Sequence, residues 1–256
     1  MDRFSPRPEV FIFTGLKQEG AWGKGNVQSE LYLINQHKMK SDPHLLNLLK
    51  RAPALSSCIT EIEKAYDLMH RSLSRGGKLL LCGNGGSASD VEHWAGELLK
   101  GFRRTRPLSL EDQSTLPPEL STRLQGALPA IPLTGFPALT TAFGNDVAPE
   151  LVFAQLVWAL GNSGDVFVGI STSGNAKNVN LAAKSARARN LVTIGLTGRN
   201  GGQLIGNCDV TICVPENETY LIQEYHLPIY HCLSLMLEEA FFSSVAAPGV
   251  AQSSQF

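Results

Sequence analysis

Residues 78–87, Lys-Leu-Leu-Leu-Cys-Gly-Asn-Gly-Gly-Ser, decide the fold class of this chain. The run that ends at Cys82 is short, apolar and uninterrupted, which is typical of a strand buried on both faces. The glycines that follow allow a tight turn and a close approach of the backbone to a ligand, and Ser87 is a suitable N-cap. With a helix expected up to Phe102, the stretch predicts a strand–loop–helix unit.

The same unit recurs along the chain. Further short apolar strands are predicted at 129–134, 165–170, 191–196 and 209–214, with helices at 45–49, 59–73, 136–143, 150–160, 175–189 and 220–242. Strands that alternate with helices indicate a parallel sheet covered on both faces. The sequence therefore predicts an α/β fold, a doubly wound five-stranded parallel sheet with N-terminal helices, whose ligands bind beyond the carboxyl ends of the strands.

Composition divides the chain into three predicted parts. Residues 1–40 mix prolines, glycines and scattered aromatics and are expected to be a poorly structured N-terminal extension. Residues 41–243 form the α/β domain, and residues 244–256 are expected to be a flexible tail. Within the domain, residues 103–128 hold several prolines and no sustained period, which predicts a loop insertion with one short helix near Pro118–Leu124.

Charge and cysteine content exclude several classes of protein. A formal net charge of -1 gives no broad attraction to nucleic acid or to an anionic membrane. Five cysteines without a CxxC pair argue against a disulfide framework and a zinc ribbon. No run approaches the ~20 apolar residues of a membrane span, and the start carries no signal-peptide core. We expect a cytoplasmic protein that binds neither nucleic acid nor membrane.

Two loops follow predicted strands and open predicted helices, Gly83–Ser87 and Ser171–Asn175. Hydroxyls of Ser171, Thr172 and Ser173 beside free backbone N–H groups at a helix start suit phosphate oxygens. An ordinary Ser/Thr-rich turn has the same composition, but two such loops at equivalent strand ends favour ligand binding. The first loop also matches a dinucleotide pattern, which we discount because no second strand ending in an acidic residue follows.

Two pairs of polar residues share helix faces. His93 and Glu97 lie four residues apart, and Gln223 and His231 lie eight apart. Imidazole and carboxylate groups are ordinary ligands of zinc, and an amide oxygen is a weaker one. Spacing alone leaves open that His93 simply pairs with Glu97 and that His231 is an interface histidine.

The order of motifs is specific. Cys82-Gly-Asn-Gly-Gly-Ser-Ala-Ser-Asp90 is followed by His93-Trp-Ala-Gly-Glu97. Further matching motifs are Gly144–Asp146, Gly169–Asn175, Leu196–Gly198 and Gln223–His231. In this order, over roughly residues 42–242, the chain resembles the sugar isomerase (SIS) family, and within it the phosphoheptose isomerases.

The resemblance implies a site and a reaction. It implies zinc held by His93, Glu97, Gln223 and His231, with Glu97 and His231 as the acid/base pair. The implied substrate contacts are Asn84, Gly85, Gly86, Ser87, Glu97, Asn145, Asp146, Ser171, Thr172, Ser173 and Gln223. The implied reaction converts sedoheptulose 7-phosphate to D-glycero-D-manno-heptose 7-phosphate through an enediol, without a nucleotide cofactor. Ala176 departs from the family, which often has a serine there, so one phosphate contact is missing or replaced.

The resemblance also implies a homo-oligomer, expected to be a homotetramer that packs through the apolar helices Leu45–Leu49 and Ile59–Leu73. The alternative is a non-catalytic SIS sugar-phosphate sensor or an adaptor that binds a partner protein. A weaker one is another SIS enzyme, such as an amino-sugar phosphate isomerase or a lyase-type etherase. Glu238 and Glu239 are expected to form a solvated face of the last helix. Arg103, Arg104 and Arg106 are expected on a solvated rim, the alternative being that they attract an anionic substrate.

Overall fold

The computed structural model describes residues 42–243, so the predicted extension and tail lie outside the described residues. Its sheet has five strands, β1 Leu79–Gly83, β2 Ala130–Pro132, β3 Val166–Ile170, β4 Val192–Thr197 and β5 Val210–Cys213. They run in the order β2-β1-β3-β4-β5, and every neighbouring pair is parallel. The predicted fold class is confirmed.

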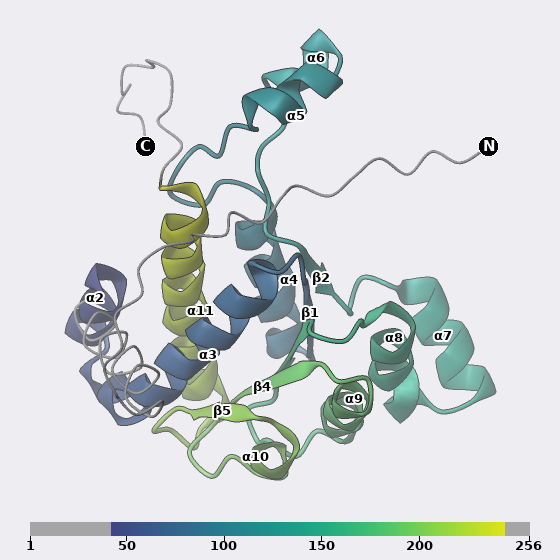
Figure 1. Cartoon of the computed structure of the whole chain (residues 1–256). Coiled ribbons are helices and arrows are strands. Elements are labelled where there is room, and N and C mark those ends of the chain that lie inside the picture. Colours follow the sequence, from purple (N-terminus) through teal and green to yellow (C-terminus); the bar gives the residue numbers. More distant parts are fainter. Residues whose placement is uncertain (1–41, 244–256) are drawn as a thin grey trace, which may run out of the picture. The chain divides into compact units, whose positions relative to one another are not determined.

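Helices cover both faces of this sheet (Figure 1). One face packs against α2 Pro43–Arg51, the 3-10 turn η1 Pro53–Cys58, α3 Ile59–Leu73, α4 Gly86–Leu99 and α11 Thr219–Phe242. The other packs against α7 Pro137–Asp146, α8 Val152–Leu160, α9 Lys177–Ala188 and α10 Leu204–Asn207, with η2 Pro149–Leu151 preceding α8. The alternation of strand β1 explains this: Leu79 and Leu81 join the first core, and Leu80 and Cys82 join the second.

The insertion projects from the domain (Figure 1). Its base is closed by an antiparallel bridge between Pro107 and Gln125. The insertion contains the predicted short helix, which is α6 Pro118–Ser121. It also contains a second helix that was not predicted, α5 Leu110–Thr115. Helix α5 forms because Ser109 is its N-cap and accepts a hydrogen bond from the Asp112 N–H.

Two sequence predictions fail for reasons of packing. Gly85, with φ 55°, is the N-cap of α4 in place of Ser87, which is buried in the first turn. Helices α2 and α3 bury much of their apolar faces in the chain's own core, although Leu46 on α2 is 52% exposed, and packing between subunits through these helices stays a prediction. Glu238 and Arg106 were expected in solvent but are 1% and 0% exposed.

Between residues 42 and 243, no helix is both long enough and apolar enough to cross a membrane.

Candidate active site

The two predicted loops meet at the carboxyl edge of the sheet because they follow the adjacent strands β1 and β3. Between them lies a cavity of ≈ 340 Å³. Its lining comprises Asn84, Gly85, Gly86, Ser87, Ile170, Ser171, Thr172, Ser173, Ala176, Thr219 and Gln223. Eight of the predicted substrate contacts are therefore brought together in one cavity by residues from four elements.

The first loop is tied to other elements across long stretches of sequence. The side-chain amides of Asn84 and Asn178 exchange two hydrogen bonds of 2.9 Å, which join the loop to helix α9. Gly86 lies directly against the side-chain amide of Gln223 on α11, with no room for a Cβ atom. Gly86 therefore allows Gln223 to reach the cavity.

The second loop is held in shape by its own hydroxyls. Ser173 Oγ accepts a hydrogen bond from the Asn175 N–H at 3.2 Å, and Ser171 Oγ accepts one from the Ala176 N–H at 3.4 Å. Gly174, with φ 65°, leaves no space for a Cβ because the backbone of residues 201 and 202 is in contact. These contacts within the protein hold the loop in shape without a ligand, and such preorganisation lowers the entropy lost on binding.

His93, Glu97 and His231 form a second group further along α4 and α11. His93 Nε2 lies 3.2 Å from Glu97 Oε1, and the ring centroids of His93 and His231 are 5.1 Å apart. The Tyr230 hydroxyl lies 3.0 Å from His93 Nδ1, so a hydrogen bond holds the His93 ring in its orientation. The Tyr230 ring stacks on Trp94 with centroids 5.5 Å apart. Sequence reasoning missed this contact of Tyr230 with the cluster, although Tyr230 directly precedes His231.

Electrostatics distinguish the groups in this cluster. Burial lowers the pKa of His231, and the nearby His93 and Arg51 lower it further. Glu97 acts in the opposite direction, but the pKa stays below its ordinary value. Burial raises the pKa of Asp90, although the Tyr230 hydroxyl bonds to it and His93 lies near it. His231 is therefore favoured as a neutral imidazole, which can both donate and accept a proton.

The predicted metal ligands are close but do not form a preformed metal centre. Among residues 42–243, no three His, Cys, Asp or Glu side chains are arranged to hold a metal ion. The donor set nevertheless suits zinc: it contains two imidazoles, a carboxylate and an amide. Two of its buried atoms, His231 Nε2 and Glu97 Oε2, make no hydrogen bond, although the Lys100 ammonium lies 3.6 Å from the latter.

Asn145 and Asp146 lie apart from the cavity. They end helix α7, are exposed, and are joined to each other by a 3.0 Å hydrogen bond between their side chains. Neither lines the cavity between the loops. Their predicted contact with substrate stays a prediction.

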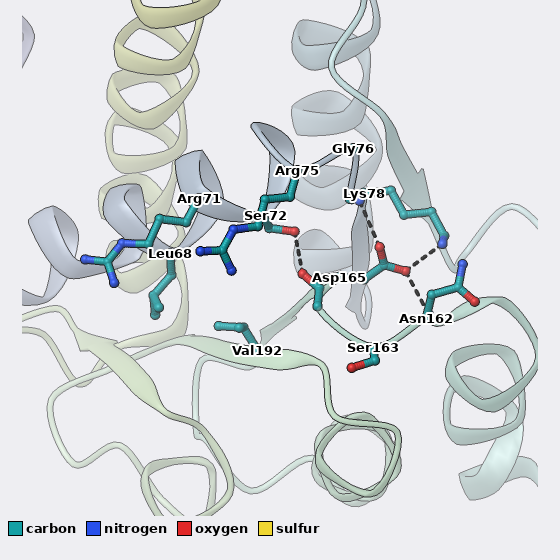
Figure 2. Close-up of a pocket in the computed structure, with 12 residues that line it drawn as sticks. Leu68, Arg71, Ser72, Arg75, Gly76, Lys78, Asn162, Ser163, Asp165 and Val192 are labelled. Carbon is teal, nitrogen blue, oxygen red and sulfur yellow. Dashed lines mark hydrogen bonds and ion pairs between the residues drawn. The ribbon is translucent and has the colours of Figure 1, made fainter. Parts of the chain in front are cut away.

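A larger cavity of ≈ 640 Å³ lies at the opposite, amino edge of the sheet (Figure 2). Lys78 and Asp165 line it and form an ion pair of 2.5 Å. No residue of the predicted site lines this cavity.

Comparison with known proteins agrees with these motifs. A family model described as the SIS domain matches residues 47–198, more than half of the chain. The phosphoheptose isomerase of Nitratidesulfovibrio vulgaris strain Hildenborough is 43% identical over 176 residues, covering 69% of this chain and 76% of that one. The phosphoheptose isomerase of Helicobacter hepaticus is 40% identical over 190 residues, covering 74% and 87%.

Solved structures agree as well. The phosphoheptose isomerase of Neisseria gonorrhoeae matches with a TM-score of 0.59 and 32% identity, over 84% of this chain and 100% of that one. The phosphoheptose isomerase of Francisella tularensis matches with a TM-score of 0.57 and 29% identity, over 84% and 99%. The chain belongs to the SIS domain family, and its relatives there include the phosphoheptose isomerases.

Proposed function

We propose that this chain is an aldose–ketose isomerase that converts sedoheptulose 7-phosphate to D-glycero-D-manno-heptose 7-phosphate. The observation that carries the proposal is that Gln223 on α11 lines one cavity with both loops. Helix α11 also presents His231, so the cavity and the acid/base cluster share two helices, α4 and α11. The relatives named as phosphoheptose isomerases support the same reaction.

The second loop is the proposed phosphate site. Ser171, Thr172 and Ser173 line the cavity, and phosphate oxygens can accept from their hydroxyls and from the N–H groups of Thr172 and Ser173, whereas the Ser171 N–H already donates to the Leu196 carbonyl. Ala176 lines the same cavity with a methyl group and contributes no hydroxyl. The phosphate is therefore held mainly by residues 171–173.

Glu97 and His231 are the proposed acid/base pair. In the ketose, the Glu97 carboxylate takes a proton from C1, and the C1–C2 double bond of the enediol forms as the carbonyl oxygen gains a proton. Return of a proton to C2, with loss of the O1 proton, gives the aldose. A neutral His231 can move the proton between the two oxygens through the ring nitrogen that does not bind zinc: this nitrogen donates its proton to O2 and then takes the proton from O1.

We assign His93, Glu97, Gln223 and His231 as ligands of a zinc ion. When bound, zinc would polarise the substrate oxygens at the reacting carbons. The donor chemistry supports this assignment, and so do two buried atoms that make no hydrogen bond, His231 Nε2 and Glu97 Oε2. No nucleotide cofactor takes part in the proposed reaction.

We propose a cytoplasmic homotetramer. All five cysteines are free of disulfide bonds, as expected in a reducing compartment.

Leu99, Tyr220 and Leu227 are large, exposed apolar side chains on the two helices that carry the site. A site completed across a subunit boundary would also account for Asn145 and Asp146 lying outside the cavity of one chain. Light scattering at micromolar concentration should give four subunits, and a monomer would contradict the assembly.

The activity is tested with zinc-loaded protein and sedoheptulose 7-phosphate. We expect conversion by the wild type and a loss of about 10²-fold or more in kcat for Glu97→Gln, the typical contribution of a general base. Glu92→Gln is the matched control, since Glu92 is an exposed carboxylate on the same helix. An inactive wild type that instead binds the sugar phosphate, or a partner protein, would favour a sensor or an adaptor.

A further inference from the structure

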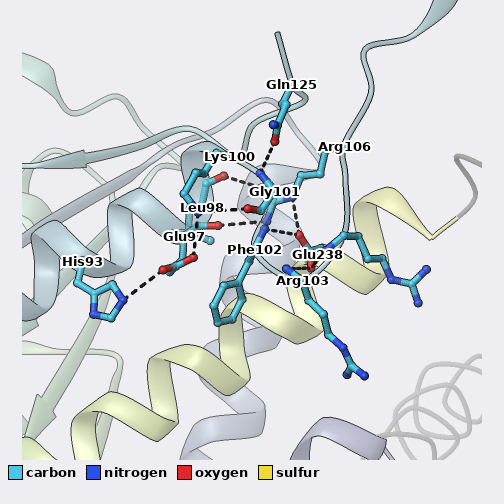
Figure 3. A network of polar contacts seen from close by, with 11 residues as sticks. His93, Glu97, Leu98, Lys100, Gly101, Phe102, Arg103, Arg106, Gln125 and Glu238 are labelled. Carbon is cyan, nitrogen blue, oxygen red and sulfur yellow. Dashed lines mark hydrogen bonds and ion pairs between the residues drawn. The ribbon is translucent and has the colours of Figure 1, made fainter. Parts of the chain in front are cut away.

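A buried ion pair lies behind the candidate active site (Figure 3). Arg106 Nε donates to Glu238 Oε1 at 2.8 Å, and only 0% and 2% of the two side chains are exposed. The Phe242 ring covers the guanidinium at 4.8 Å from its centroid. A buried pair of this kind costs desolvation energy and persists only where further hydrogen bonds satisfy both groups.

Two further N–H groups of Arg106 donate to carbonyls at the end of helix α4. Its Nη1 donates to the Leu98 carbonyl at 2.8 Å, and its Nη2 donates to the Glu97 carbonyl at 3.1 Å. The last carbonyls of a helix have no partner within the helix and carry a partial negative charge. The guanidinium therefore caps α4 and holds the main chain of the proposed base.

Glu238 holds the segment that follows α4. Its carboxylate accepts hydrogen bonds from the backbone N–H groups of Phe102 and Arg103, both at 2.9 Å, and of Arg104 at 3.2 Å. Burial alone would raise the pKa of Glu238, but the N–H groups of Phe102 and Arg103, together with Arg106, hold this pKa below its ordinary value. The segment is fixed with the Phe102 ring 5.3 Å from the His231 ring.

We propose that the Arg106–Glu238 pair is the positioning element of the acid/base machinery. Arg106 acts on Glu97 through its carbonyl, and Glu238 acts on His231 through Phe102. The two partners thus reach the two proposed reacting groups, which stand on different helices. This inference rests on the proposed function, because it assigns both groups to one reaction. A displacement of about 1 Å in such a pair costs about 10²-fold in rate.

The first test is Arg106→Lys. An ammonium keeps a positive charge facing Glu238 but cannot reproduce the planar fork that holds two carbonyls at once. We expect kcat to fall about 10²-fold, the cost of a misplaced reacting group, while KM stays near the wild-type value because residues 171–173 are untouched. Phe102→Leu keeps the ion pair and the backbone bonds and removes only the ring beside His231. It should also lower kcat.

Asp165→Asn is the matched control. Asp165 is likewise a buried carboxylate, which pairs with Lys78 and accepts from the backbone N–H groups of Lys78 at 3.0 Å and Asn162 at 2.8 Å (Figure 2). It lies at the opposite edge of the sheet, so its variant should lose stability but keep kcat. If Arg106→Lys and Phe102→Leu keep the wild-type kcat, the pair is merely structural and the proposal is overturned.

A second readout separates this inference from the proposed function. We expect the amides of the last turn of α4 to exchange hydrogen faster in Arg106→Lys than in the wild type, and not in Asp165→Asn. If the wild type does not isomerise the sugar, the proposed function fails, and exchange still reports whether the pair holds Glu97. Unchanged exchange in Arg106→Lys would remove the basis of the inference, whatever the activity.

Discussion

Acidification should destabilise the folded chain through one histidine. His226, on α11 between Gln223 and His231, is 0% exposed. Neither of its ring nitrogens makes a hydrogen bond, although the ring lies close to the backbone of Thr197. Burial lowers the pKa of His226 to about 4, from an ordinary value of 6.5. The ring is therefore neutral in the folded chain at pH values where it is charged in the unfolded chain.

The sign and size of the effect follow from these two values. Between pH 6.5 and pH 4 the unfolded chain binds a proton that the folded chain does not, so the free energy of unfolding falls as the pH falls. The stability is fully present above pH 6.5. The difference of about 2.5 pH units corresponds to a loss of about 3.4 kcal/mol below pH 4, and of about 2 kcal/mol at pH 5.

Urea unfolding followed by circular dichroism measures this loss. The free energy of unfolding is determined at pH 7.5 and pH 5.0 for the wild type and for His226→Gln. Other titrating groups contribute equally to both proteins, so the difference between the two pH values should be smaller in the variant by about 2 kcal/mol. His44→Gln, which changes a partly buried histidine in the first turn of α2, is the control and should behave as the wild type. An equal pH dependence in His226→Gln and the wild type would refute the reasoning.

Three further predictions concern packing. Gly86→Ala should lower kcat/KM with little change in melting temperature, because the new Cβ meets the movable side-chain amide of Gln223. Unchanged steady-state kinetics would count against that contact. Trp94→Ala should lower the free energy of unfolding by about 3–5 kcal/mol, since the ring is 0% exposed and stacks on Tyr230. A loss below about 1 kcal/mol in urea unfolding would contradict this packing. Cys58 should react with a thiol reagent at pH 8 only after unfolding, because burial raises its pKa to about 12; rapid labelling of the folded chain would disprove this.

The sheet could be predicted because its information is local. Strands β1 and β3 are continuous apolar runs that end at turn residues, and their carboxyl ends place both loops at one edge. Helix α5 had a local signal too, since Ser109 and Asp112 stand at capping distance within an otherwise aperiodic stretch.

The supports of the site could not be predicted, because they join distant residues. Arg106 and Glu238 are separated by 132 positions, and Asn84 and Asn178 by 94. A charged residue read alone favours solvent. Burial of Glu238 becomes favourable only once α11 meets Arg106 and three N–H groups from the segment after α4.

The closed base of the insertion has a consequence for engineering. The chain leaves at Pro107 and returns at Gln125, which are bridged, and the Gly126 N–H donates to the Arg106 carbonyl at 2.6 Å. The two ends are thus already held together, and the entropy of closing a loop grows only slowly with its length. Residues 108–124 form a module that can be shortened, or exchanged for a tag or a small domain, while the ion pair at its root stays in place.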